Sequence, residues 1–104
     1  MSSPWYGEAP LAESEEMLDE PSLYRVILHN DDYTTQEFVV WLLVTLFHMT
    51  EDTAVEVMLK VHHEGTGVAG VYTYEIAETK VAQATSLARE HEFPLLCTME
   101  PDAA

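Results

Sequence analysis

Residues 23–40 read LYRVILHNDDYTTQEFVV, and this stretch decides the fold. Its first seven residues are mostly aliphatic, aromatic or β-branched and predict a short strand. The Asn-Asp-Asp run at 30–32 consists of strong turn formers. Thr34 and Glu37 then have the spacing of a capping box, in which Thr34 caps a helix and Glu37 bonds back to it. The stretch therefore predicts a strand, a turn and a helix at about 35–48.

The remaining elements follow from the same kind of pattern. Thr50 predicts the start of a second helix, and the Gly-Thr-Gly run at 65–67 predicts its end and a loop. Residues 68–76 have the composition of a strand, residues 95–100 predict the last strand, and a third helix ends before Pro94. The order is β-α-α-β-α-β. We expect a small two-layer α+β domain, with a three-stranded antiparallel sheet against three helices.

The composition excludes several classes of function. The chain has 104 residues, with 19 Asp+Glu against 4 Lys+Arg, and a formal net charge of −15. Such acidity argues against binding to nucleic acid and to anionic membrane surfaces, both of which need basic residues. The single cysteine cannot form an internal disulfide, and no signal peptide or membrane span is predicted. We expect a cytoplasmic protein whose partners are cationic groups or other proteins.

The composition changes near residue 22. Residues 1–21 carry six acids, three prolines and no base. Such a segment has little to bury, so residues 1–22 are interpreted as a flexible acidic extension and residues 23–104 as the core domain. The extension could contact a partner or serve only as a solubilising leader.

Signals for catalysis are weak. Cys97 lies within a strand pattern, where a buried and inert thiol is the simplest interpretation. His62 and His63 are adjacent, so on a helix they diverge by about 100° and do not jointly hold one metal. The run at 65–67 lacks the lysine of a phosphate-binding loop. We expect no enzyme activity, no cofactor and no metal; a small metal-dependent hydrolase using His62 and the acids is kept as an alternative.

One polar group invites a binding interpretation. Asn30, Asp31 and Asp32 occupy a strand-to-helix turn, and a second helix packed beside the first would bring His62 towards it. Amide, carboxylate and imidazole acceptors together suit an ammonium group. The same residues are also explained by turn chemistry and a helix C-cap. The pattern alone leaves both interpretations open.

At these residues the sequence resembles the ClpS adaptor family. The resemblance runs from about Leu23 to Glu100 through several separated motifs in the right order. Besides the opening stretch these are Met58-Leu59, Val61-His62, Gly70-Val71-Tyr72-Thr73, Glu75-Ile76-Ala77-Glu78-Thr79-Lys80 and Pro94-Leu95-Leu96-Cys97-Thr98. The resemblance implies an N-end rule adaptor that binds N-degrons, which are substrates with a free, large hydrophobic N-terminal residue. It would deliver them to a ClpA- or ClpC-type AAA+ unfoldase for degradation by ClpP.

The resemblance also implies roles for particular residues. The substrate α-amino group would meet Asn30, Asp32 and His62. The pocket for its hydrophobic side chain would be lined by Leu28, His29, Asp31, Thr34, Gln36, Val39, Met58, Val61 and Leu95. Docking to the N-terminal domain of the unfoldase would involve Tyr33, Glu37, Glu75 and Lys80. We expect a monomer.

Two positions depart from the family pattern. Gln36 stands where the family usually has a methionine that excludes β-branched residues, and His29 replaces an aliphatic residue. Both changes make the predicted lining more polar. The hypothesis is an altered preference among Leu, Phe, Tyr and Trp, favouring side chains with a polar edge. The departures also leave open a regulator that modulates substrate choice by the unfoldase without delivering degrons.

Overall fold

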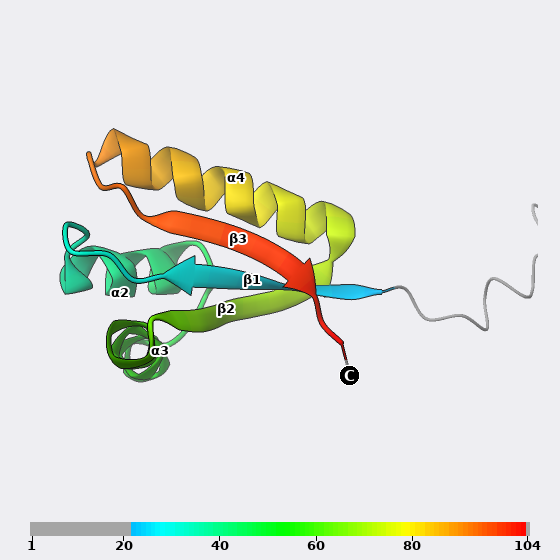
Figure 1. The fold of residues 1–104 in the computed structure, drawn as a ribbon, viewed down its shortest axis with the longest axis horizontal. Helices are drawn as coiled ribbons and strands as arrows, with labels where there is room; N and C mark the ends of the chain where they lie inside the picture. The colour runs from blue at the N-terminus through cyan, green and yellow to red at the C-terminus, as the bar shows by residue number, and fades with distance from the viewer. Residues whose placement is uncertain (1–21, 104) are drawn as a thin grey trace, which may run out of the picture.

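The computed structural model describes residues 22–103, so the predicted extension lies outside the described residues except for Ser22. The order of helices and strands is the predicted β-α-α-β-α-β (Figure 1). The α+β class, the three helices and the three-stranded antiparallel sheet are likewise confirmed. The elements are β1 (Leu23–His29), α2 (Gln36–Thr45), α3 (Glu51–Glu64), β2 (Thr66–Thr73), α4 (Tyr74–Glu90) and β3 (Leu96–Pro101).

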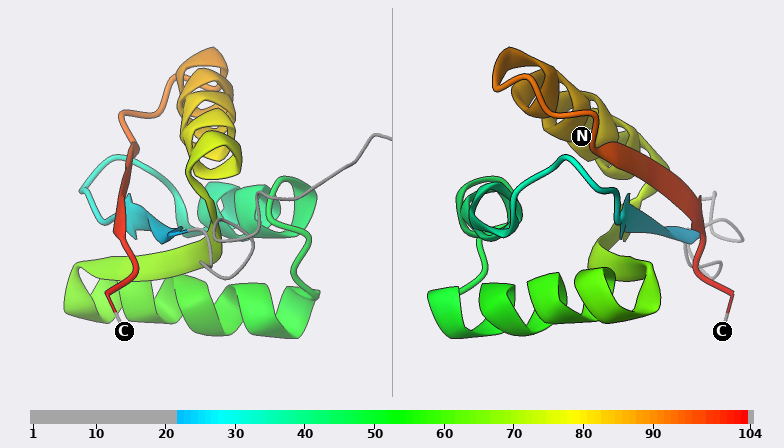
Figure 2. Two further views of the ribbon diagram at one scale, coloured as in Figure 1. Left: turned by 90° about the vertical axis from the view of Figure 1, so that its right-hand side faces the viewer. Right: turned by 60° about the vertical axis from the view of Figure 1, so that its left-hand side comes forward.

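The sheet has its first strand in the middle. The strand order is β2-β1-β3, and β1 is antiparallel to both neighbours. Val26 and Leu28 alternate with more exposed residues along β1 and are fully buried, and Leu28 pairs with the buried Cys97 of β3. These side chains join the helices in a single hydrophobic core. Figure 2 shows from two other sides that α2, α3 and α4 lie on the same side of the sheet.

The first helix begins with a different cap from the one predicted. The hydroxyl of Thr35, not Thr34, accepts a hydrogen bond of 3.1 Å from the backbone amide of Phe38. Thr34 is engaged elsewhere, because its hydroxyl donates to Asp31. The predicted Thr34–Glu37 capping box is therefore wrong. The helix also ends at residue 45 rather than at about 48, and residue 48 has a left-handed φ of 61°.

The start of α4 corrects a second boundary. Residues 74–76 were predicted to continue the strand, but they form the first turn of the helix. Thr73 is the extended N-cap residue, with φ −64° and ψ 164°, and Ala77 is the first residue that the helix buries completely. Tyr and Ile have an intermediate helix propensity that the surrounding structure readily overrides, and Tyr74 and Ile76 are each about half exposed in this turn.

The junction of α3 and β2 is tight. Gly65 ends α3 with a left-handed φ of 93°. The end of the helix at this glycine was predicted from the sequence. Thr66 and Gly67, predicted as loop, already belong to β2. A Cβ atom on Gly67 would lie 2.7 Å from Cγ2 of Val61, so only glycine lets the strand approach α3 this closely. In the described part of the chain, no helix combines the length and apolar character that crossing a membrane requires.

Candidate functional site

A crevice of about 210 Å³ opens between the β1–α2 loop, the start of α2 and the second half of α3. Its walls combine polar side chains from the loop with apolar side chains from the two helices. The lining residues are Asn30, Asp31, Asp32, Thr34, Gln36, Val39, Met58, Val61 and His62. All nine belong to the set predicted for the α-amino group or the side-chain pocket. The packing of α2 against α3 brings the two parts of this set together.

The Asp31 side chain stabilises the β1–α2 loop, which contributes polar residues to the crevice. Its carboxylate accepts hydrogen bonds from the backbone amides of Tyr33 and Thr34, at 2.8 and 2.7 Å, and from the Thr34 hydroxyl at 2.7 Å. Partial burial raises the pKa of Asp31, but these hydrogen bonds outweigh that effect and hold the pKa below its ordinary value. Asp31 therefore holds the turn as a carboxylate.

The other end of the loop is tied to α3. The backbone amide of Asn30 donates a 2.9 Å hydrogen bond to the carbonyl of Gly65, just beyond the helix. This bond places Asn30 and Asp32 beside the last turn of α3, which carries His62. Asn30, Asp32 and His62 are all exposed to solvent. The polar wall thus offers amide, carboxylate and imidazole groups on a loop that is hydrogen-bonded at both ends.

The opposite wall is apolar. Val39, Met58 and Val61 line the crevice although each is less than a tenth exposed, because they also belong to the hydrophobic core. Gln36 lies at the start of α2 and brings an amide to this side. The crevice can therefore hold a ligand that combines a cationic head with an apolar body.

Three residues predicted for the pocket do not line this crevice. Leu28 and Leu95 are almost completely buried in the core. His29 follows Leu28 along β1, so its side chain lies on the other face of the sheet, where its Nε2 is 2.8 Å from the Thr98 hydroxyl. Of the two residues predicted to make the lining more polar, only Gln36 lines the crevice.

The four residues predicted for docking to an unfoldase do not form one patch. Tyr33 belongs to the β1–α2 loop and Glu37 to the first turn of α2, whereas Glu75 belongs to the first turn of α4. Figure 1 shows the β1–α2 loop and the start of α4 at opposite ends of the domain. Lys80 is partly buried, and its ammonium donates a 2.9 Å hydrogen bond to the carbonyl of Leu46. Lys80 therefore ties α4 to the end of α2.

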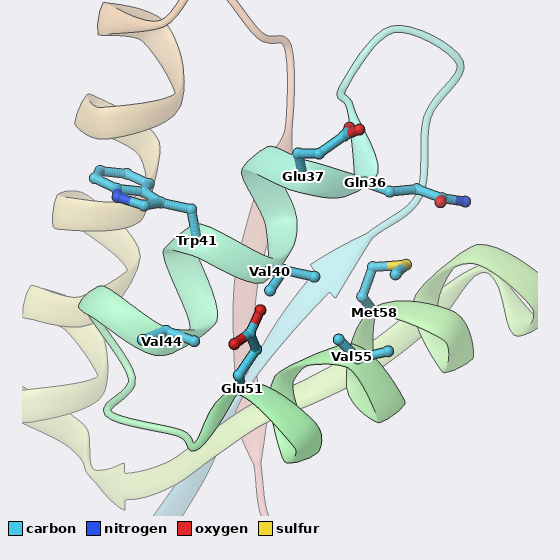
Figure 3. A pocket seen from close by; sticks show the side chains of 8 residues that line it. All are labelled: Gln36, Glu37, Val40, Trp41, Val44, Glu51, Val55 and Met58. Carbon is cyan, nitrogen blue, oxygen red and sulfur yellow. The ribbon is translucent and has the colours of Figure 1, made fainter.

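A second depression was not predicted from the sequence. It lies between α2 and α3, has a volume of about 540 Å³ and adjoins the crevice (Figure 3). The signal that could have indicated it is Trp41 with Val44, two apolar residues that fall outside the buried stripe of α2. Within residues 22–103, no three His, Cys, Asp or Glu side chains come together as a metal site would require.

Comparisons with known proteins give one consistent match for most of the chain. Residues 19–98 match the family model described as "ATP-dependent Clp protease adaptor protein ClpS". The chain is 52% identical over 96 residues to the ClpS adapter protein of Caulobacter vibrioides (strain NA1000 / CB15N), covering 92% of this chain and 88% of that protein. It is 54% identical over 88 residues to that of Syntrophus aciditrophicus (strain SB), covering 85% and 82%.

A solved structure extends the similarity to three dimensions. Agrobacterium tumefaciens ClpS2 bound to L-phenylalaninamide superposes with a TM-score of 0.77 and 48% sequence identity. The match covers 80% of this chain and 100% of that one. Phenylalaninamide has a free amino group and a benzyl side chain, which is the combination of a cationic head and an apolar body.

Proposed function

The chain belongs to the ClpS family of N-end rule adaptors of the Clp protease, which are not enzymes, and we propose that its crevice receives the first residue of an N-degron. The observation that carries this proposal is the composition of the crevice. Three polar side chains suited to an ammonium group lie opposite an apolar wall, and the crevice between them has a volume of about 210 Å³. A terminal residue presents both an ammonium group and a side chain, whereas an internal residue presents only the second.

Asn30, Asp32 and His62 would bind the α-amino group. Hydrogen bonds between an ammonium and a carboxylate are stronger than those between neutral groups. An acetylated or internal residue would leave these acceptors without a partner, at a cost of about 1–3 kcal/mol for each one that is cut off from water. This penalty would make the crevice select a free terminus over any other apolar residue.

Val39, Met58 and Val61 would surround the side chain of that residue. Burying a Leu or Phe side chain contributes roughly 1.5–3 kcal/mol. Gln36 stands at the edge of this wall, so its amide is placed to meet a polar edge of the ligand. Replacing Gln36 with Met should change the ranking of peptides that begin with Leu, Phe, Tyr or Trp. Identical rankings in wild type and Q36M would refute this part of the proposal.

Delivery would require a ClpA- or ClpC-type unfoldase. Tyr33, Glu37 and Glu75 are exposed and available for docking, whereas the Lys80 ammonium is engaged within the domain. The separation of Glu75 from the other two favours a contact that extends along the domain over a compact patch. The domain would act as a monomer, binding the degron at the crevice and the unfoldase over this surface.

A matched pair of variants tests the degron site. Asp32→Asn removes the proposed carboxylate partner of the ammonium, and Asp52→Asn neutralises an exposed acid of α3 that does not line the crevice. We expect D32N to weaken binding of a peptide beginning with Phe by about ten-fold or more, and D52N to leave it unchanged. Degradation of a reporter with the same N-terminus by the unfoldase and ClpP should follow the same order. Equal binding by the two variants would refute the role of Asp32.

A further inference from the structure

The groove beside the crevice has the properties of a binding surface. It lies between α2 and α3, with a volume of about 540 Å³. Figure 3 shows Val40 of α2 and Val55 and Met58 of α3 between the two helices, with Trp41 and Val44 farther along α2. Trp41 is 41% and Val44 37% exposed. The groove thus presents apolar surface to solvent at a site other than the degron crevice.

The groove is continuous with the crevice. Gln36 and Met58 line both of them, and in Figure 3 these two side chains lie at the same end of the groove. When the first residue of a polypeptide occupies the crevice, the residues that follow it have to pass over one edge of the crevice. The residues of α2 from 36 to 44 extend over about 12 Å, which is the length of three to four extended residues.

The charges of the groove distinguish between possible occupants. Glu37 and Glu51 contribute carboxylates to its lining, and none of its lining residues is basic. The chain's own residues 1–21 contain six acids and no base, so the groove would repel them. A segment with apolar and basic side chains would satisfy both the apolar walls and the carboxylates.

We propose that the α2–α3 groove binds the residues that directly follow the first residue of an N-degron, with a preference for apolar and basic side chains. This inference rests on the proposed function of the crevice. The crevice selects the terminal residue, and the groove adds affinity according to the next three or so positions. Substrates with the same first residue would then differ in affinity.

The test compares ligands that reach the groove with one that does not. Phenylalaninamide ends after its first residue, Phe-Gly-Gly-Gly-amide offers only backbone to the groove, and Phe-Leu-Lys-Leu-amide offers apolar and basic side chains. Val44→Lys adds a charge to the groove wall, and Leu59→Lys makes the same kind of change at an exposed residue of α3 that lines neither depression. Dissociation constants are measured by calorimetry, after circular dichroism has shown that both variants are folded.

We expect wild type to bind Phe-Leu-Lys-Leu-amide more tightly than Phe-Gly-Gly-Gly-amide. V44K should weaken binding of the first peptide by about five-fold, the loss expected when one apolar side chain stays partly in water. It should leave phenylalaninamide unchanged, and L59K should change neither. Equal effects of V44K on the long peptide and on phenylalaninamide, or no effect on either, would overturn the inference. If wild type does not bind phenylalaninamide, the proposed function fails and this inference fails with it.

Two further outcomes would assign the groove to another occupant and so overturn the inference. The first is self-association of the wild type in sedimentation experiments that V44K abolishes, which would mean that a second copy covers the groove. The second is tighter binding of the long peptide by a Trp5→Ala, Tyr6→Ala variant. That result would mean that the chain's own N-terminal segment competes for the groove.

Discussion

Replacing Lys80 with Met separates a structural role of this residue from the docking role implied by the family. The Lys80 ammonium donates to the Leu46 carbonyl at 2.9 Å and lies 6.0 and 5.8 Å from the ring centroids of Phe47 and Tyr72. A hydrogen bond to a charged group contributes about 1.5–3 kcal/mol, towards the lower end where the group is partly exposed, and cation–π contacts at such distances add about 0.5 kcal/mol. Lys80→Met should therefore lower the free energy of unfolding by about 2 kcal/mol, or the Tm by about 10 °C.

Thermal unfolding followed by circular dichroism measures this change, and binding to the N-terminal domain of the unfoldase is measured in parallel. Glu75→Gln is the matched control, because Glu75 is exposed in the first turn of α4 and should affect docking with little change in Tm. Lys80→Arg, which keeps the charge, should recover part of the stability. An unchanged Tm in K80M together with lost docking would refute the reasoning, since it would mean that the Lys80 ammonium acts at the surface.

Three further predictions concern the loop, the core and the strand beside α3. Because the pKa of Asp31 is lowered in the folded state, its carboxylate stabilises the fold above the unfolded pKa of about 4 and loses this effect as pH falls through the folded value. Asp31→Ala should therefore cost about 1–2 kcal/mol in urea unfolding at pH 7. This cost should shrink as the pH falls through the folded pKa of Asp31, and a cost that does not change across the acid range would contradict this account. Burial raises the pKa of Cys97 to about 12 and keeps reagents away from its thiol. A thiol reagent at pH 8 should therefore modify Cys97 only as fast as the protein unfolds. Rapid modification of the native protein would contradict the burial of Cys97. Gly67→Ala should displace Val61, because the added Cβ would clash with it, and should thereby destabilise the domain by about 1–3 kcal/mol and weaken binding of phenylalaninamide. An unchanged Tm and an unchanged affinity would contradict the close approach of β2 to α3.

The order of the elements could be predicted because each has a local signal. In the structure, α3 begins after the Thr50 cap and ends at the left-handed Gly65, as the sequence pattern predicts. The predicted start of the first helix was wrong because two residues compete for the role of N-cap. Thr34 and Thr35 can both cap a helix, and only the hydrogen bonds from Thr34 to Asp31 decide between them. At residues 74–76, strand-type residues occur in a helical turn because exposed positions tolerate them.

From the local pattern alone, only the polar turn, whose residues are neighbours in the sequence, could be located, and the apolar wall of Val39, Met58 and Val61 was predicted from the resemblance to the ClpS family. The Asn-Asp-Asp turn is visible in the sequence, but its approach to His62 depends on the packing of α2 against α3 and on the bond from Asn30 to Gly65. The position of His29 on the far face of the sheet follows from strand alternation once Leu28 is known to be buried. The contact of Lys80 with Leu46 joins residues 34 positions apart, and no local pattern indicates it.

The central claim is that the crevice recognises a free N-terminal residue by its ammonium group together with its side chain. Calorimetric titration of the protein with phenylalaninamide and with N-acetyl-phenylalaninamide tests it most directly, because the two ligands share the side chain and differ at the amino group. We expect the free amine to bind at one site per chain and the acetylated compound to bind at least about a hundred-fold more weakly, as the loss of two charge-assisted hydrogen bonds of about 1.5–3 kcal/mol each implies. Equal affinity for the two compounds would contradict the account.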